Sequence, residues 1–275
     1  MHWEELTSDQ FPTAVAAAGS VCLVPLSVLE RHAHHLPLGT DVFIARELCR
    51  RAAALEPAVV FPDVIFTQIL EARHQPGTVA LDADLILRLL ENVCREIARN
   101  GLTKIVLLSS HGGNQHVLRL LAQAQLAQRH AYVLYVVDPS VLPADEAALS
   151  AQWKTAVDGH AGEQETSQML AIRPDLVHLS EVGDDAEGLP LQRLEALRAA
   201  GVYTAIWWYA DHPTHYRGVG RPAAADKGER LLAAQARALA AAIRAIKADH
   251  EAQRLQNEFF DAGARHGRPG EQHDR

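Results

Sequence analysis

Val21-Cys22-Leu23-Val24-Pro25-Leu26 is a short apolar run that begins just after Gly19-Ser20 and ends at a polar loop. A run of this length suits a β-strand that is buried on both faces, as in a parallel sheet covered by helices. Similar runs at residues 59–61, 104–108 and 132–137 are separated by segments with helical spacing. This alternation predicts an α/β fold, a three-layer α/β/α sandwich with a mainly parallel sheet.

The remaining pattern predicts helices and a single domain. Helical spacing covers residues 83–99, 117–128 and 223–248, the last of which reads as a long surface helix, and residues 202–208 are a candidate strand. With 275 residues and 48% hydrophobic content, the chain can bury one sizeable core. We expect one domain over residues 1–250 and a polar, mobile tail over residues 251–275.

A loop rich in carboxylates and imidazoles follows the first apolar run: Glu30-Arg31-His32-Ala33-His34-His35-Leu36-Pro37-Leu38-Gly39-Thr40-Asp41. Ligands in open α/β sheets usually bind beyond the carboxyl ends of the strands, where this loop would lie. Glu30 and His32 would point to one side of an extended loop, and Asp41 would cap the following helix. Singly, these residues fit a loop charge, a structural histidine and a plain cap. The set predicts a site for a divalent metal ion.

Two later segments carry further reactive side chains. Ser109-Ser110-His111-Gly112-Gly113-Asn114 follows the run at residues 104–108, so His111 also lies at the carboxyl end of a strand. Paired glycines let a backbone approach a ligand closely, although an ordinary turn with a capping asparagine fits equally well. His160 precedes Glu163 and Glu165 at the start of a helix. An imidazole near a metal can carry protons to the leaving nitrogen of an amide, and the alternative is a plain helix start.

These three segments, in this order, resemble the creatininase (creatinine amidohydrolase) family. The family pattern is a Glu-x-His-x-x-His-Leu-Pro-x-x-Thr-Asp block, a His-Gly-Gly-Asn turn and a His-Ala-Gly-Glu-x-Glu-Thr-Ser block. This chain carries them at residues 30–41, 111–114 and 160–167. Pro76-Gly77-Thr78 and residues 211–220 match as well. The resemblance implies a creatininase-like α/β/α fold.

The resemblance also implies a site with two divalent ions, which would be zinc, manganese or iron. Glu30, Asp41 and His111 would hold one ion, while His32 and Asp41 would hold the other, so that Asp41 bridges them. The catalytic residues would be His160, which moves protons, and Glu165, which orients its neighbours. Matching positions expected to contact the substrate are Thr78, Gly112, Gly113, Asp158 and His215.

The chain departs from creatininase itself at two places. There the turn after the matching histidine reads Tyr-Glu-Asn, and its Glu completes the shell of the second ion, whereas this chain has Gly112 and Gly113. Glu71-Ala72-Arg73-His74-Gln75-Pro76 replaces a serine-containing segment that touches creatinine. We therefore expect a second ion that is held more weakly or with the help of Glu165, and a substrate other than creatinine.

Composition and charge limit the classes of partner that we expect for this protein. A formal net charge of -8 without a basic, aromatic-interleaved patch argues against nucleic acid. Cys22, Cys49 and Cys94 are widely spaced in apolar surroundings, as in reduced cytoplasmic proteins. No apolar run is long enough to cross a bilayer, so we expect no membrane partner and a cytoplasmic location. The resemblance implies a homo-oligomer, a hexamer built as a trimer of dimers, and residues 207–209 would lie at an interface, in a pocket wall or in the core.

The sequence therefore predicts an enzyme, a metal-dependent amidohydrolase that cleaves a cyclic or linear amide-type C–N bond in a small molecule with metal-activated water. A Gly-x-Ser-x-Gly elbow is missing, which disfavours a serine nucleophile. Alternatives within the resemblance are cleavage of a peptide, deformylation of a nucleotide intermediate and opening of a keto-inositol ring. From another class, a metal-stabilised binding or scaffold protein without turnover would also explain Gly113.

Overall fold

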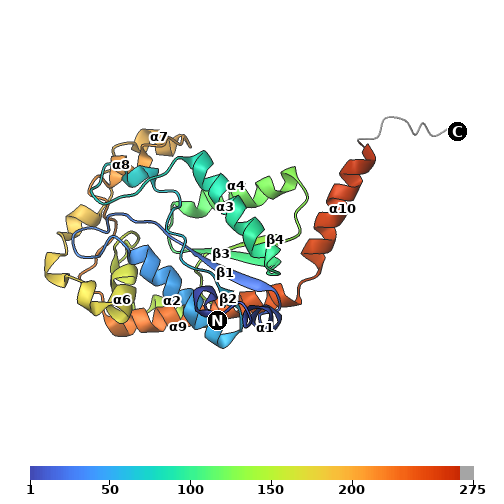
Figure 1. The fold of residues 1–275 in the computed structure, drawn as a ribbon. Helices are drawn as coiled ribbons and strands as arrows, with labels where there is room; N and C mark the ends of the chain where they lie inside the picture. The colour runs from blue at the N-terminus through green and yellow to red at the C-terminus, as the bar shows by residue number, and fades with distance from the viewer. Residues whose placement is uncertain (267–275) are drawn as a thin grey trace.

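A four-stranded parallel sheet lies at the centre of the computed structural model, which describes residues 1–266 (Figure 1). Its strand order is β2-β1-β3-β4, and all three neighbouring pairs are parallel. The register places Cys22 opposite Ile105 and Leu26 opposite Ser109. The strands are β1 (Val21–Leu26), β2 (Val59–Val60), β3 (Lys104–Ser109) and β4 (Val133–Val137).

Helices cover both faces of the sheet because successive side chains of its strands point to opposite sides. In β1, Val21 and Leu23 join one apolar cluster, whereas Cys22, Val24 and Leu26 join the other. The first cluster is closed by α2 (Thr40–Leu55), α6 (Glu163–Ile172) and α9 (Ala225–Ala248). The second is closed by α1 (Phe11–Ala17), α3 (Ala83–Arg99) and α4 (Asn114–Ala124). This arrangement confirms the three-layer α/β/α prediction.

Shorter elements connect this framework. Around the strand ends lie η2 (Leu70–Ala72), η4 (Pro174–Leu176), η5 (Leu179–Glu181), η6 (Asp185–Gly188), α7 (Glu195–Ala199) and α8 (Trp207–Asp211). The others are η1 (Trp3–Glu5), η3 (Gln125–Ala127), α5 (Pro143–Ser150) and α10 (Glu251–His266).

Three local predictions were wrong. Residues 202–206 form no strand, and the aromatic segment that follows them forms helix α8 at the rim of a cavity. Asp41 is not a helix cap, because α2 begins one residue earlier with Gly39 at its cap position. Helix α9 is not simply a surface helix, since residues such as Leu232 and Ile243 are fully buried against the sheet.

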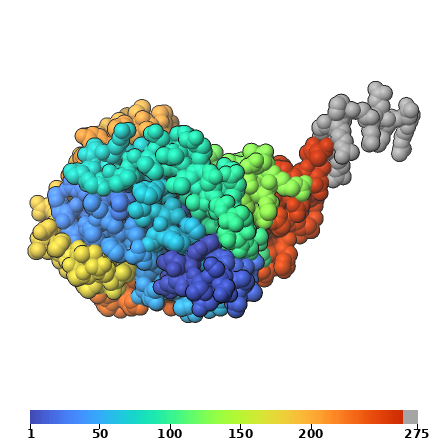
Figure 2. Space-filling model, in the orientation of Figure 1, coloured from blue at the N-terminus to red at the C-terminus, as the bar shows by residue number. Residues whose placement is uncertain are grey.

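The C-terminal segment contains structure that its polar composition did not predict. Residues 251–266 form α10, which projects from one side of the molecule (Figures 1 and 2). Gln256 donates to the carbonyl of Tyr132 (3.1 Å), and Arg129 donates to Asn257 Oδ1 (3.3 Å). The single domain over residues 1–250 stays a prediction, and residues 267–275 of the expected tail lie outside the described residues.

The three cysteines lie in the apolar interior, as their surroundings in the sequence predicted. Cys22, Cys49 and Cys94 are buried free thiols, and burial raises the pKa of each. In the described part of the chain, no helix combines the length and the apolarity that a bilayer crossing requires.

A buried ion pair joins α9 to the first residue of α6. Lys227 donates to the carboxylate of Glu163 and to the carbonyl of Pro222 (2.8 Å). Glu163 also accepts from the backbone N–H groups of Lys154 (2.9 Å) and Thr155 (3.1 Å). Burial alone would raise the pKa of Glu163, but these donors hold it below its ordinary value. The pair therefore fixes the loop that leads into α6.

Lys227→Met should destabilise the protein by about 3–5 kcal/mol, because it leaves the Glu163 carboxylate buried without its cation. Urea unfolding at neutral pH measures this loss. Arg230→Met on the same helix breaks an exposed pair with Asp226 (3.0 Å) and should cost less than about 1 kcal/mol. Since the folded pKa of Glu163 is lowered, its contribution is present above the unfolded pKa and is lost as the pH falls through the folded pKa. Equal losses for the two variants would contradict this account.

Candidate active site

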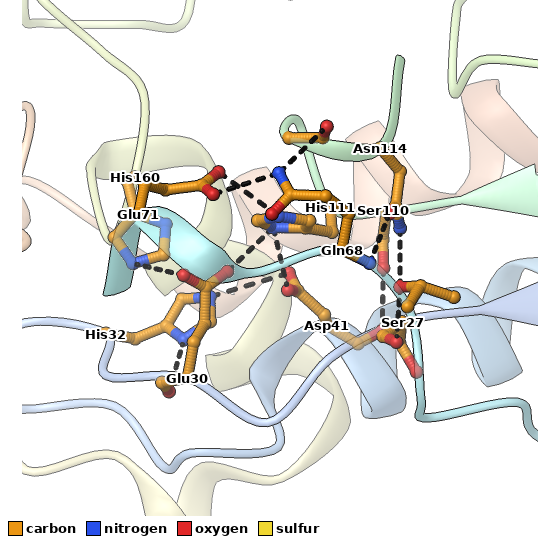
Figure 3. A network of polar contacts seen from close by, with 12 residues as sticks. Ser27, Glu30, His32, Asp41, Gln68, Glu71, Ser110, His111, Asn114 and His160 are labelled. Atoms are coloured by element: carbon orange, nitrogen blue, oxygen red, sulfur yellow. Dashed lines mark hydrogen bonds and ion pairs between the residues drawn. The ribbon is translucent and has the colours of Figure 1, made fainter. Parts of the chain in front are cut away.

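Two carboxylates and an imidazole meet where β1 and β3 end (Figure 3). Glu30 follows β1, Asp41 lies in the first turn of α2, and His111 follows β3. His111 Nδ1 is 2.7 Å from Glu30 Oε1 and 3.5 Å from Asp41 Oδ2. All three side chains are buried, and one ligand atom from each lies within 4.8 Å of the others. The structure thus brings together the three residues predicted to hold the first ion.

His32 lies beside this group in an orientation suited to a ligand. Its Nδ1 donates to the carbonyl of Glu30 (3.2 Å), so in the neutral ring Nε2 carries the lone pair that a metal ion would use. Nε2 is 3.4 Å from Asp41 Oδ1 and 3.9 Å from Glu165 Oε2. His32, Glu165 and His160 form a second group of convergent ligand atoms. Asp41 therefore lies between two possible ion positions, and Glu165 is near enough to assist at the second.

The charges of the cluster attract cations. Burial alone would raise the pKa of Glu30 and of Asp41, but the surrounding imidazoles hold both below their ordinary values. Burial opposes protonation of His32, yet Asp41 and Glu30 raise the pKa of this ring to about 9. Glu30 Oε1, Asp41 Oδ2 and His32 Nε2 are buried without a hydrogen-bond partner. Carboxylate and imidazole atoms left without hydrogen bonds fit a divalent ion such as zinc, manganese or iron.

His160 lies against this cluster with its protonation state set by its surroundings. Its ring is 4.1 Å from the ring of His32 and 4.4 Å from that of His215, measured between centroids. Nε2 donates to the carbonyl of Arg31 (2.6 Å), so Nδ1 is the proton acceptor of the ring. Burial lowers the pKa of His160 to about 3, and the ring is therefore neutral near pH 7.

Glu165 stabilises the turn that carries His160. Its Oε2 accepts from the backbone N–H of Ala161 (2.6 Å), a residue held in the left-handed region with φ of 57°. Burial raises the pKa of Glu165 to about 8, and Asp41 adds to this shift. A carboxyl group with such a pKa can hold or release a proton near neutral pH.

His215 is a direct partner of Glu30. The indole N–H of Trp208 donates to His215 Nδ1 (2.7 Å), which places the ring proton on Nε2, and Nε2 donates to Glu30 Oε2. Hydrogen bonds of this kind orient a carboxylate ligand. His215 was predicted to contact substrate, and the structure places it both in this chain of hydrogen bonds and at the cavity lining. The part of Trp208 was not predictable from the sequence, since a tryptophan seven residues from a histidine carries no recognisable signal.

The glycine turn is held by Asn114. The side-chain amide of Asn114 donates to Thr67 Oγ1 (2.7 Å) and Ser109 Oγ (2.9 Å), and its Oδ1 accepts from the backbone N–H of Gln68 (3.1 Å). These bonds bring the segment around η2 against the turn (Figure 3). The carboxylate of Glu71 consequently lies in the site, where it accepts from Gln68 Nε2 (2.9 Å).

Glu71 is a site residue that sequence reasoning missed. Its Oε1 is 3.8 Å from His111 Nε2, the ring nitrogen that faces away from Glu30 and Asp41. A Cβ atom on Gly113 would collide with both Glu71 Oε1 and His111 Nε2. The absence of a side chain at position 113 therefore leaves room for a carboxylate that comes from another segment.

The other predicted substrate positions differ in their surroundings. Gly112 and Gly113 line the cavity, together with His160 and Glu165. Thr78 and Asp158 are not among its lining residues, and each has a buried oxygen without a hydrogen-bond partner, Thr78 Oγ1 and Asp158 Oδ1. Burial raises the pKa of Asp158.

The cluster opens into a cavity of about 1420 Å³. Glu30, His111 and His160 are part of its lining, residues 203–209 form an aromatic wall, and Arg73 and Arg217 also border it. The aromatic segment thus forms a pocket wall, which was one of the three positions that its sequence left open. Ile206 and Trp207 are 55% and 38% exposed, so they give the cavity an apolar side. This side contrasts with the charged floor of the cavity.

A carboxylate and imidazole cluster at the strand ends of a parallel sheet, open to a cavity, defines an α/β protein whose ligand set suits divalent ions. The chain matches the family description "Creatininase: Creatinine amidohydrolase" over residues 4–243, and it belongs to this family. A creatinine amidohydrolase of Pseudomonas putida is 32% identical over 197 residues, which are 66% of this chain and 75% of that protein. A mycofactocin precursor peptide peptidase of Mycolicibacterium smegmatis is 32% identical over 221 residues, or 77% of this chain and 79% of that protein.

Solved structures agree with this assignment. The structure named "Creatininase Mn" superimposes with a TM-score of 0.71 at 26% identity, covering 90% of this chain and 99% of that chain. A creatininase variant of "Zn-Zn type" gives the same TM-score and identity over 90% of this chain and 98% of that chain. The creatininase-like fold predicted from the sequence is therefore confirmed.

Gly113→Ala should destabilise the protein by about 1–3 kcal/mol, because the added methyl group collides with Glu71 and His111. Gly112→Ala is the matched control: a Cβ there meets no atom within 4 Å, and the change should be neutral or stabilising by up to about 1 kcal/mol. Denaturant unfolding measures both.

Glu71→Ala combined with Gly113→Ala should recover part of the lost stability, because one of the two colliding groups is gone. A double variant whose loss equals the sum of the two single losses would show that Glu71 and residue 113 do not compete for this space.

Proposed function

We propose that this protein is a metal-dependent amidohydrolase that hydrolyses an amide-type C–N bond other than a peptide bond in a small molecule. The observation that carries the proposal is the convergence of Glu30 and His111 at the floor of the cavity with His32 and Asp41 buried next to them, beside His160. Support also comes from the related proteins, which are named as amidohydrolases and peptidases, and from the manganese and zinc forms of creatininase.

Two divalent ions would fit the ligand set. Glu30, Asp41 and His111 would hold the first ion, and His32 and Asp41 the second, with Glu165 close by. Such ions lower the pKa of bound water from 15.7 to about 7 and polarise the carbonyl group under attack. Glu71 would orient His111 from behind through its Nε2, and His215 would orient Glu30.

His160 would move the proton. Its neutral ring offers Nδ1 as acceptor while Nε2 stays bound to the carbonyl of Arg31. A proton accepted at Nδ1 can then be donated to the leaving nitrogen, which becomes a free amine. Glu165, whose pKa is raised to about 8, would supply or take up a proton beside it.

The cavity favours a substrate larger than creatinine. Its volume of about 1420 Å³ exceeds the roughly 300–1000 Å³ that is common for small-molecule pockets. Gly112 and Gly113 leave this space open at the turn beside His111. The same volume keeps peptide cleavage as a second candidate, in line with the 32% identical mycofactocin precursor peptide peptidase. A cytoplasmic location and a homo-oligomer, a hexamer by family resemblance, complete the proposal.

Metal analysis tests the ligand set. Purified protein loaded with zinc or manganese should hold about two ions per chain, and His111→Ala should lose at least one of them. At a free metal concentration of about 100 times the dissociation constant, binding should stabilise the fold by about 2.7 kcal/mol. Chelation should reverse both the stabilisation and any hydrolysis. A folded protein that hydrolyses amides after complete removal of metal would contradict the proposal.

His160→Ala should lower kcat about 10²–10⁴-fold for any amide that the wild type hydrolyses, because the proton acceptor is lost. Metal content measured by plasma emission should stay near the wild-type value. Loss of the ions in this variant would instead make His160 a ligand and would remove its proposed role.

A further inference from the structure

Two arginines that line the cavity, Arg73 and Arg217, have side chains without a hydrogen bond or ion pair in the described part of the chain. Every other arginine side chain from Arg31 to Arg254 donates to a protein group. Arg51 binds Glu229, for example, and Arg193 binds two backbone carbonyls. Among the arginines from Arg31 to Arg254, the guanidinium groups without protein partners are thus the two at the cavity.

Arg217 is held next to the reaction centre by its backbone. Its N–H donates to the carbonyl of His160 (2.9 Å). Its Cδ atom lies 3.0 Å from the position that a Cβ on Gly159 would occupy, and Nε lies 3.3 Å from it. Because residue 159 has no side chain, the stem of Arg217 runs along the turn that carries His160. The guanidinium group is exposed at the cavity.

The charges around the cavity indicate which kind of ligand these arginines can bind. The chain has a formal net charge of -8, and the described lining of the cavity includes the carboxylates of Glu30 and Glu71 but no lysine, so Arg73 and Arg217 are the permanently charged cations that the lining offers to a negatively charged ligand. A guanidinium group binds carboxylate or phosphate oxygens through two parallel hydrogen bonds. The apolar wall at residues 203–209 keeps water away from one side, which strengthens such a contact.

We propose that the substrate of this site carries a negatively charged group, a carboxylate or a phosphate, which Arg217 binds while the scissile amide lies over the carboxylate and imidazole cluster. The aromatic wall takes the apolar part of the same molecule, and Arg73 is a second cation for the charged group. This inference rests on the proposed amide hydrolysis and adds to it the chemical class of the substrate.

Matched pairs of amides test the inference on the metal-loaded, full-length protein. One pair is N-formylphenylalanine and its neutral carboxamide, and the other is 4-formamidophenyl phosphate and neutral 4-formamidophenol. Calorimetry measures binding, and release of formate measures hydrolysis. The charged member of at least one pair should bind about 10–100-fold more tightly than its neutral partner, as expected for charge-assisted hydrogen bonds. The pair with the larger ratio distinguishes carboxylate from phosphate.

Arg217→Ala should remove this preference, raising KM for the charged member about 10–100-fold with kcat changed less than about threefold, while the neutral member is unaffected. Arg217→Lys should restore part of the binding, and Arg73→Ala should have a smaller effect. The control is Arg221→Ala, since Arg221 lies outside the cavity lining and donates to the carbonyls of Val182 and Gly183 (both 3.3 Å).

The outcomes separate the two proposals. Equal binding of charged and neutral members, an equal effect of Arg217→Ala on both, or no binding of either anion overturns the inference about Arg217. Binding that depends on charge and on Arg217 but is followed by no formate release supports the anion site and counts against amide hydrolysis.

Discussion

The burial of two carboxylates, Glu30 and Asp41, is the constraint on which this end of the molecule depends. A buried charge without a partner costs several kcal/mol, so the chain must surround these groups with imidazoles, protons or cations. His32, His111 and His215 come from three distant segments to meet this need. For His32 and His215, hydrogen bonds on the far side of the ring fix which nitrogen faces the acids. The arrangement of the segments that meet at the strand ends therefore reflects electrostatics as much as packing.

The sequence predicted that the residues following the strands lie in the site. It did not predict the residues of other segments that contact them there. The carboxyl ends of parallel strands meet at one edge, so Glu30 and His111 had to lie near each other once β1 and β3 were recognised as neighbours. Glu71 and Trp208 reach the site from two short helices, η2 and α8, whose positions depend on tertiary contacts. Glu71 is brought into the site by the hydrogen bond that Asn114 donates to Thr67, and no local sequence pattern predicts this contact.

The fold, like the site, was predictable from the sequence in part. Continuous apolar runs identified β1 and β3, because strands buried on both faces need no alternation, and a similar run identified the half-buried edge strand β4. The strand predicted over residues 202–208 was wrong, since aromatic and β-branched side chains favour strands in general, whereas residues 203–209 here line a cavity beyond the sheet. The buried face of α9 was hidden by alanine, whose small side chain permits close helix packing without a strong apolar signature.

The aromatic wall and the residues after it are held largely by segments outside the sheet. Arg193 binds the carbonyls of Tyr209 and Ala210, Leu191 pairs with Asp211, and Trp208 donates to His215. A segment anchored in this way can change its length or composition while the layered scaffold stays intact. Selection acting on ligand choice can thus proceed there almost independently of selection acting on folding, which would let one ancestral architecture diversify toward chemically unrelated molecules.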